Sequence, residues 1–168
     1  ELCLGLFAER GLKCHDGQGV SLRLVDTAVV TEPGQTGGQW RIHYSLQWPT
    51  LRCDYFKLPG NEGKGAGESL RQFPGGPGDL ILADRGYCHA GGVHHVAEGK
   101  AFVTVRLNPN SINLQTPQGD AFPLLEKLKP IRWTGQVDAW DVLVPFESRE
   151  PVAARICVVR KSNAAIAR

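Results

Sequence analysis

Apolar and polar side chains alternate along three segments in the first part of the chain. In residues 39–48 (QWRIHYSLQW) every second side chain is apolar or aromatic, which is the period of a half-buried strand. Residues 21–30 (SLRLVDTAVV) place Leu22 and Leu24 on one face and end in β-branched residues, so they also predict a strand. Residues 52–58 (RCDYFKL) follow after a short link. Consecutive strands with short links usually pair, so these segments predict an antiparallel meander.

Helices and strands are predicted to alternate in the middle of the chain. A short helix is expected at 68–73, because prolines and glycines at 74–77 end it. Residues 78–84 (GDLILAD) form a nearly continuous apolar run, which is typical of a central strand buried on both faces. A second helix is expected within 89–100, followed by a strand at 101–107. This order predicts an α/β fold with a mixed sheet, made of an antiparallel meander plus parallel strands.

Residues 107–168 have a different pattern, with several prolines and mostly strand-like pieces. The strand-like pieces are 111–115, 136–144 and 154–160, and the only helical piece is 122–128. We interpret this part as a β-rich insertion that follows a core formed by residues 1–106.

Composition and charge narrow the class of protein only slightly. The chain has 168 residues, the size of one domain, and its net charge of +2 permits an anionic partner without requiring one. No apolar run approaches the roughly 18 residues of a membrane span, so a soluble protein without a membrane partner is expected. The 5 cysteines include no C-x-x-C pair, which favours a reducing, cytoplasmic setting over a disulfide framework. There is no methionine and no signal peptide, so we expect a segment of a longer chain.

Two acids stand in or at the end of predicted strands. Asp26 lies within the first strand and Asp84 ends the central one. In a meander followed by a crossover, the first strand becomes the neighbour of the strand after the first helix, which would bring the two carboxylates together. Their repulsion is usually relieved by a divalent cation, and oxygen ligands favour Mg²⁺. The alternative for either acid alone is a cap on the next turn or an ion pair with Arg85.

A series of motifs resembles a known family. The motifs RLVDTAVVTEPG, WRIHY, GESL, GDLILADRGY and FVTVRL, in this order, resemble the insertion-sequence DDE transposases, whose catalytic domain has the RNase H-like fold. The resemblance covers about residues 21–160. Asp26 matches the first metal-binding Asp of the family, although relatives more often show Asp-Gly-Thr there. Asp84 matches the second, which opens an Asp-Arg-Gly-Tyr or Asp-Arg-Gly-Phe element.

The resemblance implies a function and a set of site residues. It implies a DNA transposase that cleaves DNA strands and transfers 3′ hydroxyl ends with Mg²⁺, for which Mn²⁺ can substitute. Asp26 and Asp84 would be catalytic and metal-binding, and Arg85, Arg106 and Tyr87 would contact nucleic acid. The partners would be double-stranded DNA, as transposon ends and target, and a second copy of the full-length protein in the synaptic complex. A bacterial transposase would be cytoplasmic and associated with the nucleoid.

The third acid of this family is missing from the sequence. It is the Glu of a Tyr-x2-Arg-x3-Glu-x6-Lys motif on a late helix, but no tyrosine follows Tyr87, and position 90 is Ala where Arg is required. Glu126, Glu147 and Glu150 are expected to be surface acids. We therefore expect a fragment that lacks both the N-terminal DNA-binding domain and the catalytic Glu helix, and that is inactive alone.

Several alternatives remain open. Arg85 and Arg106 hold DNA phosphates or neutralise the acids, and Tyr87 contacts DNA or packs in the core. His43 faces away from Trp40, towards the site or towards solvent. The group Cys88, His89, His94 and His95 forms a zinc site or, more commonly for such spacing, the exposed rim of a helix. The whole chain is a transposase fragment, an inactive transposase-derived DNA-binding relic, or another RNase H-like nuclease.

Overall fold

The computed structural model describes residues 2–8, 20–31, 39–58 and 67–162. Their strands are β1 (Leu2–Ala8), β2 (Ser21–Thr31), β3 (Gln39–Gln47), β4 (Arg52–Lys57), β5 (Asp79–Ala83), β6 (Phe102–Arg106), β7 (Val137–Val144) and β8 (Val152–Arg160). Their helices are the 3-10 turns η1 (Leu70–Gln72) and η2 (Arg85–Tyr87) and the α-helices α1 (Ala90–Glu98) and α2 (Leu124–Leu128). None of these described helices has the length and apolar character to cross a membrane.

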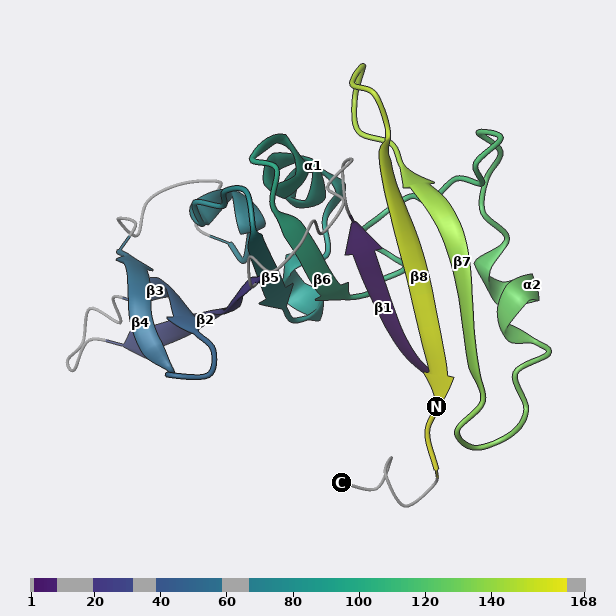
Figure 1. The fold of residues 1–168 in the computed structure, drawn as a ribbon, viewed down its shortest axis with the longest axis horizontal. Coiled ribbons are helices and arrows are strands. Elements are labelled where there is room, and N and C mark those ends of the chain that lie inside the picture. The colour runs from purple at the N-terminus through teal and green to yellow at the C-terminus, as the bar shows by residue number, and fades with distance from the viewer. Residues whose placement is uncertain (1, 9–19, 32–38, 59–66, 163–168) are drawn as a thin grey trace.

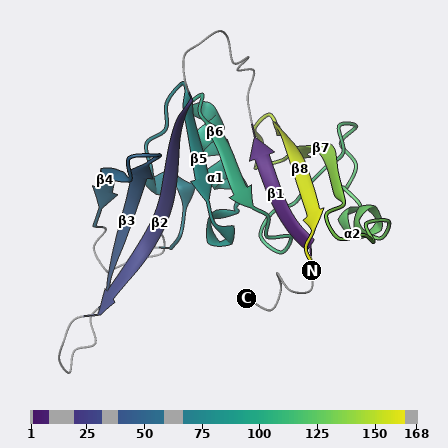
Figure 2. The same ribbon diagram turned by 60° about the horizontal axis from the view of Figure 1, so that its bottom comes forward.

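The described strands form one mixed sheet in the order β4-β3-β2-β5-β6-β1-β8-β7 (Figures 1 and 2). β2, β3 and β4 make the predicted antiparallel meander. β5 then pairs in parallel with β2, and β6 pairs in parallel with β5. The predicted α/β class is confirmed, and so is the expected pairing of the first strand with the strand after the first helix.

Strand β1 was not expected from the sequence. It pairs antiparallel with β6 on one side and with β8 on the other, and its register joins Leu4 to Val158 and Leu6 to Val105. The alternation of leucines at 2, 4 and 6 was a usable signal, but the partners of this strand lie far along the chain. β1 therefore connects the β7–β8 hairpin to the parallel strands in a single continuous sheet.

One face of the sheet holds the core. Ile81 of β5 and Val103 and Val105 of β6 point to this face and are at most 1% exposed. They pack with Val93 and Val96 of α1 in one hydrophobic cluster. Figure 2 shows α1 behind β5 and β6, so the helix covers this face only.

The other face of the central strand is accessible, which corrects the expectation that residues 78–84 are buried on both faces. Leu82 is 39% exposed, whereas its neighbours Ile81 and Ala83 are buried. η1, which precedes β5, and α1, which follows it, lie on the same side of the sheet. Leu70 of η1 belongs to the same core cluster as the buried residues of α1. An apolar run shows that a strand is central, but it does not show whether both faces are covered.

Other expected elements are shorter than their patterns suggested. The helix expected at 68–73 is the single 3-10 turn η1, where the Ser69 hydroxyl accepts a hydrogen bond from Arg71 N at 3.3 Å. Residues 111–115 form no strand beyond isolated bridges of Gln115 to Ala121 and Leu143. The expected helix at 89–100 and the helical piece at 122–128 are confirmed as α1 and α2.

A buried arginine joins the three strands of the meander to the first parallel strand, β5. Arg23 of β2 is 7% exposed, and its Nε lies 2.8 Å from Oδ2 of Asp54. Its Nη1 lies 3.4 Å from Oδ2 of Asp79 and donates to the carbonyl of Pro74 at 2.6 Å. Its Nη2 donates to Oγ of Ser45 at 3.1 Å. A buried charge needs such partners, so this group holds β4 and β5 against β2.

Candidate functional site

The parallel strands β2, β5 and β6 bring three predicted site residues into one row. The β2–β5 ladder ends at the pair Leu24–Leu82, and Asp26 and Asp84 each follow two residues later. The β5–β6 ladder ends one residue before Asp84 on β5 and one residue before Arg106 on β6. Because these strands are parallel, their carboxyl ends meet at one edge of the sheet. Asp26, Asp84 and Arg106 therefore lie at the same level on three neighbouring strands.

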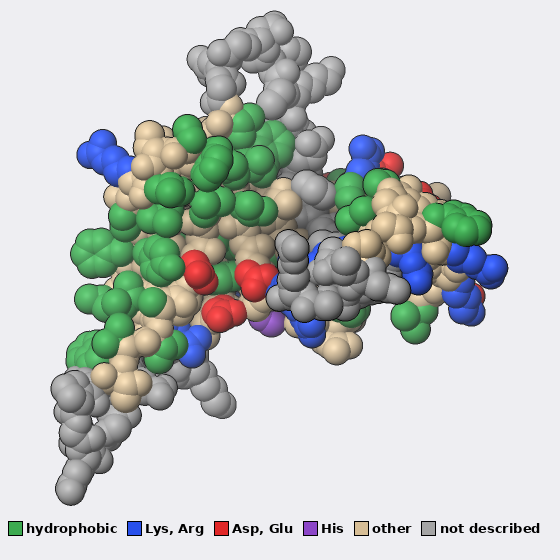
Figure 3. Space-filling model, turned by 90° about the horizontal axis from the view of Figure 1, so that it is seen from below, with side chains coloured by type: hydrophobic (Ala, Val, Ile, Leu, Met, Phe, Trp, Pro, Cys, Tyr) green, Lys and Arg blue, Asp and Glu red, His purple; other side chains and the backbone are tan. Residues whose placement is uncertain are grey.

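This edge is also the point where the chain changes direction in the sheet. β2 continues to β3 on one side, and β5 continues to β6 on the other. Ligands of open α/β sheets bind at such a switch point, outside the carboxyl ends of the strands. Asp26 and Asp84 are exposed and share the face of Leu82, opposite α1. Viewed from the side away from α1, acidic side chains gather in the middle of a largely apolar surface (Figure 3).

Asp84 forms an ion pair with Arg106. Nε of Arg106 lies 2.9 Å from Oδ1 of Asp84, and Nη2 donates to Oδ2 at 3.3 Å. Both side chains are more than half exposed, so the pair contributes little to stability and can open for a ligand. Arg85 is exposed; its carbonyl accepts from the backbone N of Cys88 at 3.2 Å, but its guanidinium makes no hydrogen bond or ion pair with the described residues. In this structure Arg106 neutralises Asp84, which agrees with one of the two roles expected for it; a contact with phosphate stays a prediction.

Asp26 accepts two hydrogen bonds. Its Oδ1 accepts from the backbone N of Thr27 at 2.8 Å, and its Oδ2 accepts from the hydroxyl of Tyr44 at 3.4 Å. Burial raises the pKa of Tyr44, and the charge and the hydrogen bond of Asp26 raise it further. Tyr44 therefore stays a neutral donor to the Asp26 carboxylate, which keeps outer lone pairs for another ligand.

Tyr87 lies in the core and not on the exposed surface beside the aspartates. Its ring is 1% exposed and meets Phe73 edge to face, with the ring centroids 6.0 Å apart. The hydroxyl forms a short hydrogen bond with Oγ1 of Thr27, which in turn lies 3.0 Å from Nδ1 of His43. His43 is fully buried, so it faces neither of the environments expected for it. Burial and the charges of Arg41 and Lys57 lower the pKa of His43, so its ring is neutral.

The burial of Tyr87 predicts a loss of stability at high pH. Burial, as the main cause, raises the pKa of Tyr87 to about 12 from 10.0. The folded state thus holds this proton more tightly than the unfolded state, and its stabilising effect is complete below pH 10. Between pH 10 and about 12 the free energy of unfolding should fall by roughly 1.4 kcal/mol for each pH unit. Urea unfolding as a function of pH checks this, because Tyr87→Phe should have a flatter profile; equal slopes would contradict it.

A third carboxylate, that of Glu68, lies beside the turn that Asp84 opens, and sequence reasoning missed it. A Cβ atom added to Gly86 would lie 1.4 Å from Oε2 of Glu68, so this carboxylate occupies the space that a side chain at position 86 would need. The charges of both Asp26 and Glu68 act on the Tyr87 hydroxyl. The signal was present in the sequence, as the Glu of GESL and the Gly of ADRGY, but only the fold brings these two elements together.

The described residues do not contain a complete cage for a metal. No group of three or more His, Cys, Asp or Glu side chains among them is arranged to hold an ion. In the group at 88–95, Cys88 and His94 are buried, and Nε2 of His94 lies 2.8 Å from the carbonyl of Val144. Nε2 of His95 lies 3.2 Å from the carbonyl of Phe73. His94 and His95 therefore bind two different carbonyls, and Cys88 and His94 are core residues instead of an exposed rim.

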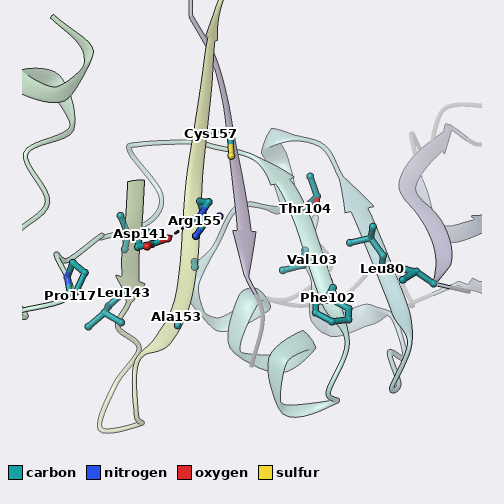
Figure 4. A pocket seen from close by; sticks show the side chains of 13 residues that line it. Leu80, Phe102, Val103, Thr104, Pro117, Asp141, Leu143, Ala153, Arg155 and Cys157 are labelled. Atoms are coloured by element: carbon teal, nitrogen blue, oxygen red, sulfur yellow. Dashed lines mark hydrogen bonds and ion pairs between the residues drawn. The ribbon is translucent and has the colours of Figure 1, made fainter. Parts of the chain in front are cut away.

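A cavity of about 810 Å³ lies elsewhere and is lined mainly by residues of β6 and of the β7–β8 hairpin (Figure 4). Its walls are mostly apolar, with Phe102 and Leu143 on opposite sides. Its two charged residues, Asp141 and Arg155, pair with each other at 2.8 Å. None of the predicted site residues lines it. We therefore place the candidate chemistry at the row of carboxylates and not in this cavity.

Two curated proteins of Escherichia coli are similar to the chain. A protein named as the InsL transposase of insertion sequence element IS186A, from strain K12, is 27% identical over 112 residues, which cover 66% of this chain and 30% of that protein. The transposase of insertion sequence element IS421 is 27% identical over 112 residues, which cover 66% of this chain and 29% of that protein. No family model and no solved structure matches the chain. The chain is thus distantly related to insertion-sequence transposases and spans less than a third of the length of these relatives.

Proposed function

We propose that this chain forms part of the catalytic centre of a DDE-type DNA transposase, which cleaves DNA strands and transfers 3′ hydroxyl ends. The observation that carries the proposal is the row of Asp26 and Asp84 at the switch point of the sheet. An antiparallel meander followed by two parallel strands agrees with the RNase H-like fold that the sequence motifs imply. The distant relationship to insertion-sequence transposases supports the same function.

The donor chemistry of the row fits Mg²⁺. This ion usually takes one or two carboxylates from the protein and completes its shell with water and substrate phosphate. Asp26 and Asp84 supply two exposed carboxylates of the required kind, and we propose them as the ligands. When bound, Mg²⁺ or Mn²⁺ would activate the attacking hydroxyl and stabilise the leaving oxygen of the phosphodiester.

The other charged residues of the row would bind and orient the DNA. Arg85 is exposed directly after Asp84, and its guanidinium can take a phosphate in a bidentate contact. Arg106 would exchange its weak pair with Asp84 for a DNA phosphate when a cation takes over the carboxylate. Tyr87 supports the turn from the core. The DNA substrates would be transposon ends and target, held by a dimer of the full-length protein.

One observation favours a second candidate, an inactive transposase-derived DNA-binding relic. The described residues offer no group of three donors for a metal, and a site with two carboxylates would hold its ions loosely. In that case the arginines would bind phosphates without any contribution of a divalent cation. A hydrolytic RNase H-like nuclease is the third alternative, and it would cleave DNA without strand transfer.

The proposal is tested by measuring whether divalent cations couple DNA binding to the aspartates. We expect that Ca²⁺, which supports binding without cleavage, tightens the affinity of the chain for a duplex with a free 3′ end by at least about fivefold in fluorescence anisotropy. The double variant Asp26→Asn, Asp84→Asn should lose this gain. An affinity that is independent of Ca²⁺ and of both aspartates would leave the relic as the function. Mn²⁺-dependent nicking of a plasmid by the chain alone would instead favour the nuclease.

A further inference from the structure

A buried polar network crosses beneath the candidate site. It runs from the hydroxyl of Tyr87, which ends η2, through Oγ1 of Thr27 on β2 to Nδ1 of His43 on β3. We call these three residues the hydroxyl network. Tyr87 is 1% exposed, His43 is fully buried and Thr27 is partly buried, so the two ends of the network are shielded from water. Each hydrogen bond is therefore costly to break.

The hydroxyl network connects the two segments that carry the aspartates. Thr27 follows Asp26 directly, and its backbone N donates to the Asp26 carboxylate at 2.8 Å. Tyr87 closes the turn that Asp84 opens, because its backbone N donates to the carbonyl of Asp84 at 3.1 Å. The last ladder pair of β2 and β5 is Leu24–Leu82, two residues before the aspartates. Beyond that pair, the Thr27–Tyr87 bond joins the two segments.

The ends of the network are held by packing. The Tyr87 ring and the His43 ring both meet Phe73 edge to face, with centroid distances of 6.0 and 6.1 Å. Nε2 of His43 has no partner among the described residues, so the Thr27 hydroxyl is the one hydrogen bond that orients this ring. The protons can run from Tyr87 through Thr27 to His43 or in the reverse direction, depending on the tautomer of the His43 ring. In either direction the same three side chains are joined, and packing on Phe73 fixes the two rings at the ends of the network.

We infer that the hydroxyl network is a positioning device that sets the separation of Asp26 and Asp84 and thereby the affinity of their edge for a divalent cation. The inference rests on the proposed function, because it assumes that the two carboxylates share a cation. Tyr87, Thr27 and His43 touch neither cation nor substrate in this arrangement. They act through the strand end and the turn that carry the ligands, as outer partners of metal ligands commonly do.

The inference is tested with Tyr87→Phe and Thr27→Val, which remove a hydroxyl and keep the shape. Tyr55→Phe is the matched control, because the Tyr55 ring packs on the same Phe73, at 6.0 Å, away from the aspartates. Amide hydrogen exchange at Tyr87 and Cys88 reports on the turn, and Mn²⁺ titration calorimetry reports on the cation. We expect both hydroxyl variants to speed exchange of these two amides and to weaken Mn²⁺ binding by about tenfold each, relative to the control.

The two readouts separate the inference from the proposed function. Circular dichroism and urea unfolding show that each variant is folded, and amides of α1 should keep their protection. If wild-type protein binds Mn²⁺ and both hydroxyl variants bind it equally well, the positioning role is overturned while the proposed function stands. If the turn amides exchange no faster than in Tyr55→Phe, the network does not hold the turn, and the inference is also overturned. Wild-type protein without Mn²⁺ binding overturns the proposed function itself.

Discussion

Replacing Asp84 by Asn should lower the affinity of the protein for Mn²⁺ by at least about tenfold in titration calorimetry. The substitution keeps the shape of the side chain but removes the negative charge that a hard cation requires. Asp26→Asn should have an effect of the same size, since the two carboxylates lie at the same level on neighbouring parallel strands. The double variant should not lose much more than either single variant, because the ligands of one ion are not independent.

Asp138→Asn is the matched control for these variants. Asp138 is an exposed strand residue on β7, and its carboxylate accepts a hydrogen bond from the next backbone N at 2.9 Å, as that of Asp26 does at 2.8 Å. Asp138 thus makes the same backbone hydrogen bond as Asp26, but it lies on β7, outside the row of Asp26 and Asp84. Mn²⁺ binding that is equally strong in Asp84→Asn and in Asp138→Asn would show that the row of aspartates does not bind the cation.

Replacing Arg23 by Ala should lower the free energy of unfolding by about 3 kcal/mol or more in urea denaturation. The guanidinium is nearly fully buried and is shared between Asp54 and Asp79. Its removal leaves two carboxylates at 29% and 23% exposure, and it also leaves the Pro74 carbonyl without this donor. Uncompensated partly buried charges are the reason for the large expected cost.

Arg155→Ala serves as the control for the Arg23 variant. Nε of Arg155 also lies 2.8 Å from a carboxylate, that of Asp141, but the two side chains are 61% and 65% exposed. An exposed pair of this kind should contribute less than about 1 kcal/mol, because solvent screens it. Similar losses for Arg23→Ala and Arg155→Ala would contradict the assignment of Arg23 as a buried anchor.

The strands that alternate clearly in sequence could be predicted because their pairing is local. Residues 39–48 show the period of a strand, and the short links on either side of this meander bring neighbours together. The apolar run before Asp84 likewise predicted a central strand, and the row of Asp26 and Asp84 follows from the expected pairing of β2 with β5. These predictions depend only on periodicity and chain connectivity.

The parts that could not be predicted depend on contacts between distant segments. β1 pairs with β6 and β8, which lie far along the chain, so its short leucine pattern had no local partner to mark it. Leu82 is exposed because the helices on either side of β5 lie on one face, and an apolar run contains no information on which faces are covered. Glu68 reaches Gly86 only after the chain has passed through η1 and β5.

By itself, the sequence determined the α/β class, the meander and the placement of Asp26 and Asp84 on neighbouring strands, because side-chain periodicity and short links act over a few residues. The tertiary structure decided the rest. It placed Tyr87 in the core, paired Asp84 with Arg106 and joined the turn of Asp84 to β2 through Thr27. The physical reason is that burial and hydrogen-bond partners depend on which distant segments pack together, and the one-dimensional pattern of the chain does not contain that information.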